Sequence, residues 1–514
     1  MIDLKKSFVI HPFILAGLPA LCLYAYSAQE YPLSVLLWPL VVTLALTLLL
    51  VLSTWLICRS LNKAGVIISL FVALIFSTGY VFELKTLWGI IGSVISGVLL
   101  VLVWALLFPI VSYRVLKAQT DLRKATIILN VAAIGMLLMA SFRIGVTEAR
   151  RLSDDNNIMA SEPAVHLNVS GQQALPDIYY IILDRYASAG MIAEIYDFDN
   201  SDFINYLTDQ GFYVASESAA NYVRTSQSLA SSLNMEYIDY MDEDSKDLVP
   251  LNEKIRDNAL QRSLKSAGYE FINVGSWWEP TRENRYADMN INYGASMSEF
   301  SKSLVGMTMP YSVLTNLDLV DDKYMEQWKR TLFEFASMAD DIPTRDEPTF
   351  TFAHLLITHE PYVFDNDGSF LSHEEVSNRS GRDNYVNSVI ATNNLVKELV
   401  NKLLSTSEVA PIIIIQADEG PYPERYSANY RGFNWEQATD IEIKQKMGIL
   451  NAYYLPGVDR SVLYPSITPV NSFRLIFDFY FGTKLGLLPD VSYTYVDYGH
   501  PYRFLDVTDK VRFH

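Results

Sequence analysis

The sequence contains only two cysteines in 514 residues. Both of them, Cys22 and Cys58, lie in apolar segments near the N-terminus. The chain after residue 58 therefore forms no disulfide and offers no thiol nucleophile. The sequence also lacks an internal repeat and an extended low-complexity tract.

Basic residues are outnumbered in most of the chain. Residues 1–146 contain ten Lys/Arg and four Asp/Glu, whereas residues 147–514 contain thirty and fifty-four, and the formal net charge is −18. An acidic C-terminal part argues against a nucleic-acid partner and is compatible with divalent cations.

The N-terminal part contains five apolar runs, at residues 8–28, 34–58, 64–82, 87–113 and 125–142. Each approaches or exceeds the roughly 20 residues that cross a bilayer as a helix. We therefore expect residues 1–146 to form a five-helix transmembrane domain, whose first run lacks a signal-peptide cleavage site and is retained. Eight Lys/Arg in the loops of one side against Lys85 on the other place the N-terminus in the cytoplasm and the C-terminal part outside the cytoplasm.

A polar stretch, residues 147–174, indicates a linker, and residues 175–514 alternate strand-like and helix-like segments. The apolar, β-branched runs 178–183, 269–274, 350–357, 410–417 and 449–455 predict strands. Residues 201–210, 252–267, 384–404 and 472–481 predict helices. This order is typical of an α/β domain with a mostly parallel central sheet covered on both faces.

Polar residues follow three of the predicted strands. Asp184, the segment Thr358-His359-Glu360-Pro361 and the pair Asp418-Glu419 stand where ligands bind in open α/β sheets. Asp184 has an equal alternative as a turn residue, and His359 as a packed histidine. The adjacent carboxylates of Asp418 and Glu419 favour a ligand role, because they follow four isoleucines and need compensation.

The segment 221–235 supplies the candidate nucleophile, Thr225, in a hydroxyl-rich turn before a short helix of small residues. Negative charge is favoured at a helix N-terminus, although an ordinary N-cap has the same preferences. A divalent metal that bridges Asp184, Thr225, Asp418 and Glu419 would relieve the repulsion between the carboxylates. It would also lower the pKa of the hydroxyl and stabilise a phosphoryl transition state.

At these residues the chain resembles the alkaline phosphatase superfamily, specifically the sulfatase-like membrane transferases typified by lipoteichoic acid synthases. The resemblance implies that Asp184 and Asp418 are metal ligands, Thr225 a covalently modified nucleophile, and His359 a substrate-side histidine. Such enzymes usually have Asp-His-Gly where this chain has Asp418-Glu419-Gly420. The assigned donors are then all oxygens, which favours Mg²⁺ or Mn²⁺ over Zn²⁺ or else indicates that catalysis has been lost.

The resemblance also limits which group the enzyme is expected to transfer. The turn at Thr225 has no C/S-x-P-x-R motif for formylglycine, and the outer domain lacks the disulfides of phosphoethanolamine transferases. A phosphoglycerol-type group is therefore the expected cargo. Ser228 and Trp278 are further candidate substrate contacts, with Trp277-Trp278-Glu279 forming either a sugar platform or ordinary aromatic packing.

The expected function is a metal-dependent transferase in the bacterial cytoplasmic (inner) membrane. Thr225 would attack a membrane lipid headgroup, and the phospho-group would pass to an envelope glycan or polymer in the extracytoplasmic or periplasmic space. Two alternatives stay open: a phosphodiester hydrolase of the same fold, and an inactive binding or scaffold protein in which Glu419 replaces the histidine.

Overall fold

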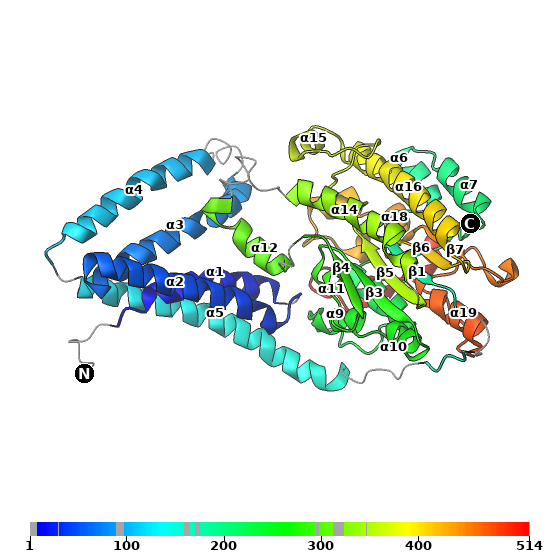
Figure 1. Cartoon of the computed structure of the whole chain (residues 1–514), viewed down its shortest axis with the longest axis horizontal. Coiled ribbons are helices and arrows are strands. Elements are labelled where there is room, and N and C mark those ends of the chain that lie inside the picture. The colour runs from blue at the N-terminus through cyan, green and yellow to red at the C-terminus, as the bar shows by residue number, and fades with distance from the viewer. Residues whose placement is uncertain are drawn as a thin grey trace. The chain divides into compact units, whose positions relative to one another are not determined.

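The computed structural model describes residues 8–28, 30–88, 97–120, 122–158, 165–169, 175–294, 298–311, 323–345 and 347–512. The chain divides into two compact units (Figure 1). One unit comprises residues 1–154 and 297–321, and the other comprises residues 155–296 and 322–514.

The first unit is helical. Its elements are α1 (His11–Ser27), η1 (Leu33–Leu36), α2 (Leu37–Cys58), α3 (Leu61–Trp88), α4 (Gly97–Lys117) and α5 (Arg123–Ile158). Helices cover most of the described residues of the five predicted apolar runs. Residues 8–10 precede α1, residues 87 and 88 of the fourth run end α3, and residues 89–96 lie outside the described part. Two described stretches, 33–58 and 123–149, have both the length and the hydropathy of a membrane span, and the apolar segment 61–76 of α3 is shorter.

Helix α5 continues well past the apolar run 125–142 and ends at Ile158. Residues 143–158 contain no proline and only one glycine, Gly145, so nothing in this stretch terminates the helix. Residues 147–158 of the polar stretch expected to be a linker are therefore helical, and residues 159–164 and 170–174 lie outside the described part.

A short helix from the C-terminal half of the chain also belongs to the first unit. Helix α12 (Glu299–Gly306) begins after Ser298, whose hydroxyl accepts the N–H of Ser301. Its Phe300 and Leu304, four residues apart on one helix face, are buried in a cluster with Tyr24 and Tyr31.

The second unit contains a seven-stranded sheet in the order β2-β7-β6-β1-β5-β3-β4. Strands β1 (Ile178–Leu183), β3 (Glu270–Gly275), β4 (Met289–Asn292), β5 (Thr349–Leu355) and β6 (Ile412–Gln416) pair in parallel. Strand β7 (Asn451–Tyr454) is antiparallel to β6 and to β2 (Tyr213–Val214). The mostly parallel sheet predicted from the apolar strands is confirmed.

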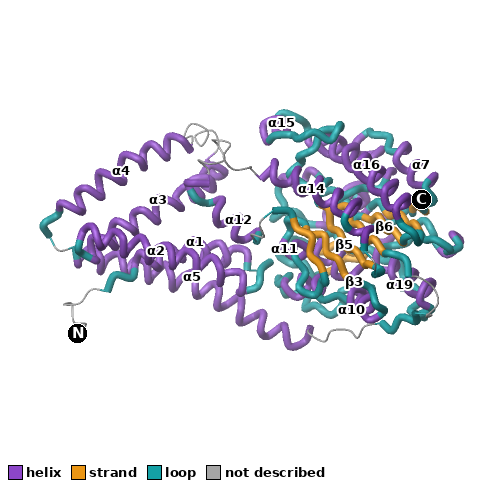
Figure 2. The backbone as a smooth tube through the Cα atoms, viewed as in Figure 1, coloured by secondary structure: helices purple, strands orange, loops and turns teal. Residues whose placement is uncertain are grey.

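Helices cover both faces of this sheet (Figure 2). Alternate residues of β1 face opposite sides, so Tyr179, Ile181 and Leu183 enter one core, and Ile178, Tyr180 and Ile182 enter the other. The first core contains α6 (Ala189–Tyr196), α7 (Ser201–Asp209), α14 (Lys323–Asp340), α16 (Gly381–Thr406) and α18 (Asp440–Met447). The second contains α8 (Thr225–Asn234), α9 (Val249–Arg256), α10 (Ala259–Ser266) and α19 (Pro469–Phe481).

The helix predicted over residues 252–267 is in fact two helices, α9 and α10. The break occurs because Asn258 adopts an extended conformation and its side chain caps α10 by accepting the N–H of Gln261. The remaining described elements are α11 (Glu279–Arg282), η3 (Ile342–Thr344), α15 (His373–Ser377), α17 (Glu424–Ala428), η4 (Trp435–Gln437), η5 (Arg460–Val462), β8 (Tyr493–Tyr495), β9 (Phe504–Asp506) and α20 (Thr508–Val511).

Candidate active site

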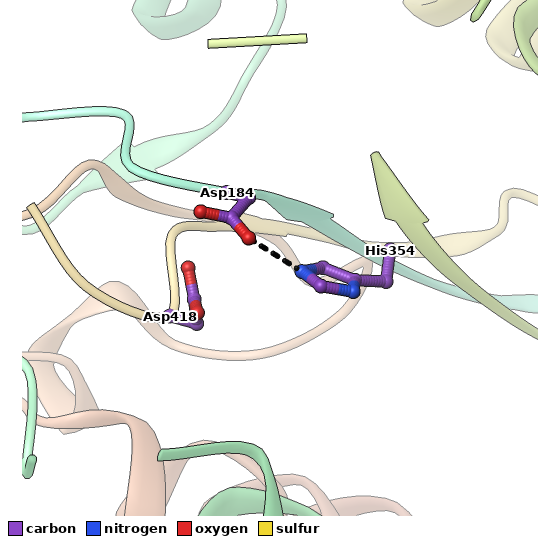
Figure 3. A group of neighbouring side chains, drawn as sticks. All are labelled: Asp184, His354 and Asp418. Carbon is purple, nitrogen blue, oxygen red and sulfur yellow. Dashed lines mark hydrogen bonds and ion pairs between the residues drawn. The ribbon is translucent and has the colours of Figure 1, made fainter. Parts of the chain in front are cut away.

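Three buried side chains from neighbouring strands converge at the carboxyl edge of the sheet. Asp184 follows β1, Asp418 follows β6, and His354 lies near the end of β5, opposite Ile182 in the register. One donor atom from each of the three lies within 4.8 Å of the others (Figure 3). Two carboxylates and an imidazole at these separations are able to hold a divalent cation.

Asp184 is fixed by its own backbone as well as by its side chain. Its N–H donates to the Leu355 carbonyl at 3.0 Å, and its carbonyl accepts from the Thr358 hydroxyl at 2.5 Å. The Oδ2 atom lies 3.1 Å from Nε2 of His354. The Oδ1 atom is buried without a hydrogen-bond partner and lies 3.7 Å from Nε of Arg185.

His354 was not among the residues predicted from the sequence. Its ring is fully buried, and Nδ1 lies 3.0 Å from the Thr281 hydroxyl, which in turn lies 2.8 Å from the Ser276 hydroxyl. Because hydroxyl groups both donate and accept, this pair is able to support either tautomer of the imidazole. The signal in the sequence was the single histidine within the predicted strand 350–357. It was missed because only the residues that follow each strand were considered as ligands.

Asp418 is held in place by two backbone contacts. Its Oδ1 accepts the N–H of Arg185 at 3.4 Å, and its carbonyl accepts the Ser228 hydroxyl at 2.5 Å. Its Oδ2 is buried and has no hydrogen-bond partner. Burial, with repulsion from Asp184 and Glu419, raises the pKa of Asp418 well above its usual range. A cation beside Oδ2 would reverse this effect.

Thr225 is the first residue of α8 and is half-buried, whereas the rest of this helix is buried. The N-cap position belongs to Arg224, whose side chain makes no capping hydrogen bond, so Thr225 is not the N-cap of this helix. The Thr225 hydroxyl is close enough to Asp418 to lower the pKa of that carboxyl. The candidate nucleophile thus lies beside one of the three clustered side chains.

Glu419 contacts two basic side chains and not the Asp184–His354–Asp418 group. Its Oε1 lies 2.6 Å from Nζ of Lys446 and 3.7 Å from Nε of Arg185. Lys446 and Glu419 are both buried, and Nζ of Lys446 also donates to the Gly420 carbonyl at 2.8 Å. Among the described residues, the Asp184–His354–Asp418 group does not include Glu419.

One aromatic ring covers both cations next to Glu419. Nζ of Lys446 lies 3.2 Å, and the guanidinium carbon of Arg185 4.7 Å, from the centre of the Tyr422 ring. The Tyr422 hydroxyl donates to the Val223 carbonyl at 3.1 Å, two residues before Thr225. Tyr422 therefore connects the acidic turn to the segment that carries the candidate nucleophile.

Two of the three predicted substrate-binding residues, His359 and Trp278, lie beyond β5 and β3. His359 is half-buried, its Nδ1 contacts the Glu360 carbonyl, and its ring lies 5.5 Å from that of Trp277. Burial, with the nearby Arg185 guanidinium, lowers the pKa of His359 to about 3. The half-buried Trp278 ring packs edge-on 5.6 Å from His354.

Comparisons with known proteins identify the family to which the α/β unit is similar. The family model described as Sulfatase matches residues 176–446, more than half of the chain. A search of curated proteins found no match.

Several solved structures show a weak likeness. The C-terminal periplasmic domain of EcEptC from Escherichia coli in complex with Zn is 12% identical, with a TM-score of 0.43, covering 62% of this chain and 86% of that one. The integral membrane lipooligosaccharide phosphoethanolamine transferase A from Neisseria meningitidis is 10% identical, with a TM-score of 0.43 and coverages of 91% and 93%. The lipoteichoic acid synthase LtaP from Listeria monocytogenes is 10% identical, with a TM-score of 0.40 and coverages of 65% and 82%.

Proposed function

Because this chain belongs to the sulfatase family, we propose that it is a membrane-anchored, metal-dependent phosphotransferase. The donor is a membrane lipid with a phosphoglycerol-type headgroup, and the acceptor is a glycan or polymer of the bacterial envelope. The observation that carries this proposal is the position of Thr225 beside Asp418 in a cluster with Asp184 and His354.

The anchor and the location are parts of the same proposal. Residues 1–146 would cross the bacterial cytoplasmic membrane five times, with the catalytic domain in the extracytoplasmic or periplasmic space. The loop charges support this orientation, since eight Lys/Arg lie on the predicted cytoplasmic side. A lipid donor and its diacylglycerol product would then both remain in the membrane that anchors the enzyme.

The clustered residues fit a divalent cation. Two of their carboxylate oxygens, Oδ1 of Asp184 and Oδ2 of Asp418, are buried without hydrogen-bond partners, and His354 adds a nitrogen donor. When bound, the ion would lower the pKa of the Thr225 hydroxyl and offset charge on the phosphoryl group. The imidazole removes the all-oxygen argument for Mg²⁺. Because two of the three donors are carboxylates, which suit Mn²⁺, we propose Mn²⁺.

The chain's own residues define the two steps. Thr225 Oγ1 forms a bond to phosphorus and passes its proton to the Asp418 carboxylate, while the bond from phosphorus to the diacylglycerol oxygen breaks and that oxygen takes up a proton from water. The acceptor hydroxyl then attacks the phosphorus, the bond to Thr225 breaks, and Asp418 returns its proton to Thr225 Oγ1. The Glu360 carbonyl only accepts hydrogen bonds, so Nδ1 of His359 carries the hydrogen and Nε2 is free to accept the proton of the acceptor hydroxyl.

Ser228 and Trp278, the two further candidate substrate contacts, have different roles in this proposal. The Ser228 hydroxyl is committed to the Asp418 carbonyl, so its contribution would be to hold the acidic turn. Trp278 packs against His354 and would line the site next to the phosphoryl group.

The full chain in detergent micelles, supplied with Mn²⁺ and labelled phosphatidylglycerol, provides the test. We expect release of diacylglycerol and a phosphoglycerol adduct on the peptide that contains Thr225. Thr225→Ala should lower turnover by at least ~1000-fold and abolish the adduct, with an unchanged thermal midpoint. Turnover that persists in Thr225→Ala would exclude Thr225 as the nucleophile.

A further inference from the structure

The acidic turn after β6 carries two adjacent carboxylates with different surroundings. Asp418 has a free, buried Oδ2 and belongs to the Asp184–His354–Asp418 group. Glu419 is only 1% exposed and lies against Lys446, which is not exposed at all. The turn therefore presents one carboxylate to the cluster and the other to a cation of the protein itself.

We infer that Lys446 is a positioning residue that keeps Glu419 out of the metal's coordination shell. The Lys446 ammonium group neutralises the Glu419 carboxylate, which would otherwise be available to bind the ion. The inference rests on the metal site of the proposed function. It concerns only which carboxylate of the turn holds the ion.

Three contacts fix Lys446 in this position. Its ammonium group donates to the Gly420 carbonyl at 2.8 Å, lies 2.6 Å from Oε1 of Glu419, and faces the Tyr422 ring at 3.2 Å. Arg185 contributes a second cation, 3.7 Å from the same carboxylate oxygen. These contacts give Glu419 two cationic neighbours within the protein.

The backbone holds the same arrangement together. The Gly420 N–H donates to the Lys446 carbonyl at 2.8 Å, so the turn and the end of α18 are joined by both backbone and side chain. A Cβ at position 420 would lie 2.3 Å from the Gln445 carbonyl oxygen. The pairing of Glu419 with Lys446 thus depends on the glycine that follows the two acids.

Metal binding distinguishes the two carboxylates. We would measure Mn²⁺ binding to the full chain in detergent micelles by the electron paramagnetic resonance signal of free Mn²⁺. Asp418→Asn should weaken Mn²⁺ binding at least tenfold, whereas the affinity of Glu419→Gln should remain within threefold of the wild type.

Lys446→Met should bind Mn²⁺ more tightly than the wild type because an adjacent positive charge is removed. Lys444→Met, on the same helix, serves as the matched control. Loss of Mn²⁺ in Glu419→Gln as severe as in Asp418→Asn would overturn the inference.

A second measurement needs no metal and so separates this inference from the proposed function. Removing one partner of a buried ion pair leaves an uncompensated charge, whereas removing both partners does not. In metal-free buffer, Glu419→Gln and Lys446→Met should each lower the thermal midpoint by about 5 °C or more. The double variant should recover at least half of that loss, and losses that simply add would show that the two residues are not paired. If the wild type binds no Mn²⁺, the proposed metal site fails, and so does the role of Lys446 in excluding Glu419 from it.

Discussion

The ammonium group of Lys446 lies 2.6 Å from the Glu419 carboxylate, and both side chains are shielded from solvent. Burial lowers the pKa of Lys446 to about 8, although Glu419 opposes this shift. The adjacent Asp418 instead belongs to the cluster with Asp184 and His354. Of these two consecutive residues, Asp418 would hold the ion of the proposed metal site, whereas Glu419 pairs with a cation of the protein itself.

The hydroxyl behind His354 should control how well this imidazole binds metal. Thr281→Val removes the partner of Nδ1, which lies 3.0 Å away, and should weaken Mn²⁺ binding by about tenfold or more. Thr281→Ser keeps the hydroxyl and should bind like the wild type. Equal affinities for the valine and serine variants, measured by Mn²⁺ titration, would exclude a role for this hydrogen bond.

Glu334 on α14 should make stability depend on pH in a defined direction. Burial raises the pKa of Glu334 to about 8 from an ordinary value of 4.5, against the effect of Arg330. The folded state therefore binds more protons than the unfolded state between these values, and stability should fall as pH rises through this window, by up to ~1.4 kcal/mol per pH unit.

Glu334→Gln cannot ionise and should lose this dependence. Thermal midpoints measured from pH 5 to pH 8.5 should show the variant gaining on the wild type as the pH increases. The exposed Glu408 offers a matched control, since Glu408→Gln should follow the wild-type profile. Parallel profiles for Glu334→Gln and the wild type would contradict the prediction.

Gly420→Ala should disturb the site through the backbone. The added Cβ would lie 2.3 Å from the Gln445 carbonyl oxygen and 3.0 Å from that of Lys446, so the acidic turn must move. We expect a loss of stability of about 1–3 kcal/mol, together with weaker Mn²⁺ binding.

Gly190→Ala is the control for this change, because a Cβ at that position in α6 meets nothing within 4 Å. Alanine there should be neutral or slightly stabilising, as expected for glycine replacement inside a helix. Chemical denaturation of the two variants compares them directly. Equal stability of both would show that the turn has room to accommodate a side chain.

Reporter fusions should reveal the orientation in the membrane. A reporter that is active only outside the cytoplasm should be active when fused after His514 and inactive when fused at Ala118, between α4 and α5. Activity at Ala118 would reverse the proposed orientation, and activity at both positions would contradict the number of spans between them.

Much of the α/β unit was predictable from local patterns. Strand β6 (Ile412–Gln416) is an example: its four consecutive isoleucines indicate burial on both faces, which is typical of a parallel sheet. In the structure this strand is fully buried and pairs in parallel with β1. The helix ends before Gly211 and Gly482 were also predictable, because glycine adopts without strain the positive φ angle that often ends a helix. Both glycines have a positive φ angle in the structure. The prediction of a single helix over 252–267 was wrong. Asn258 caps a new helix in the middle of this stretch, and the apolar periodicity from which the helix was predicted contains no information about capping.

The sequence by itself determined that Asp184 and Asp418 end buried strands, since continuous apolar runs and the acids that follow them are local features. Only the tertiary structure decided which further residues join them. His354 meets Asp184 through the parallel register of β1 and β5, 170 residues apart, and Lys446 meets Glu419 because α18 returns to the turn after β6. Strand register and helix return depend on long-range packing, which no stretch of the sequence encodes alone.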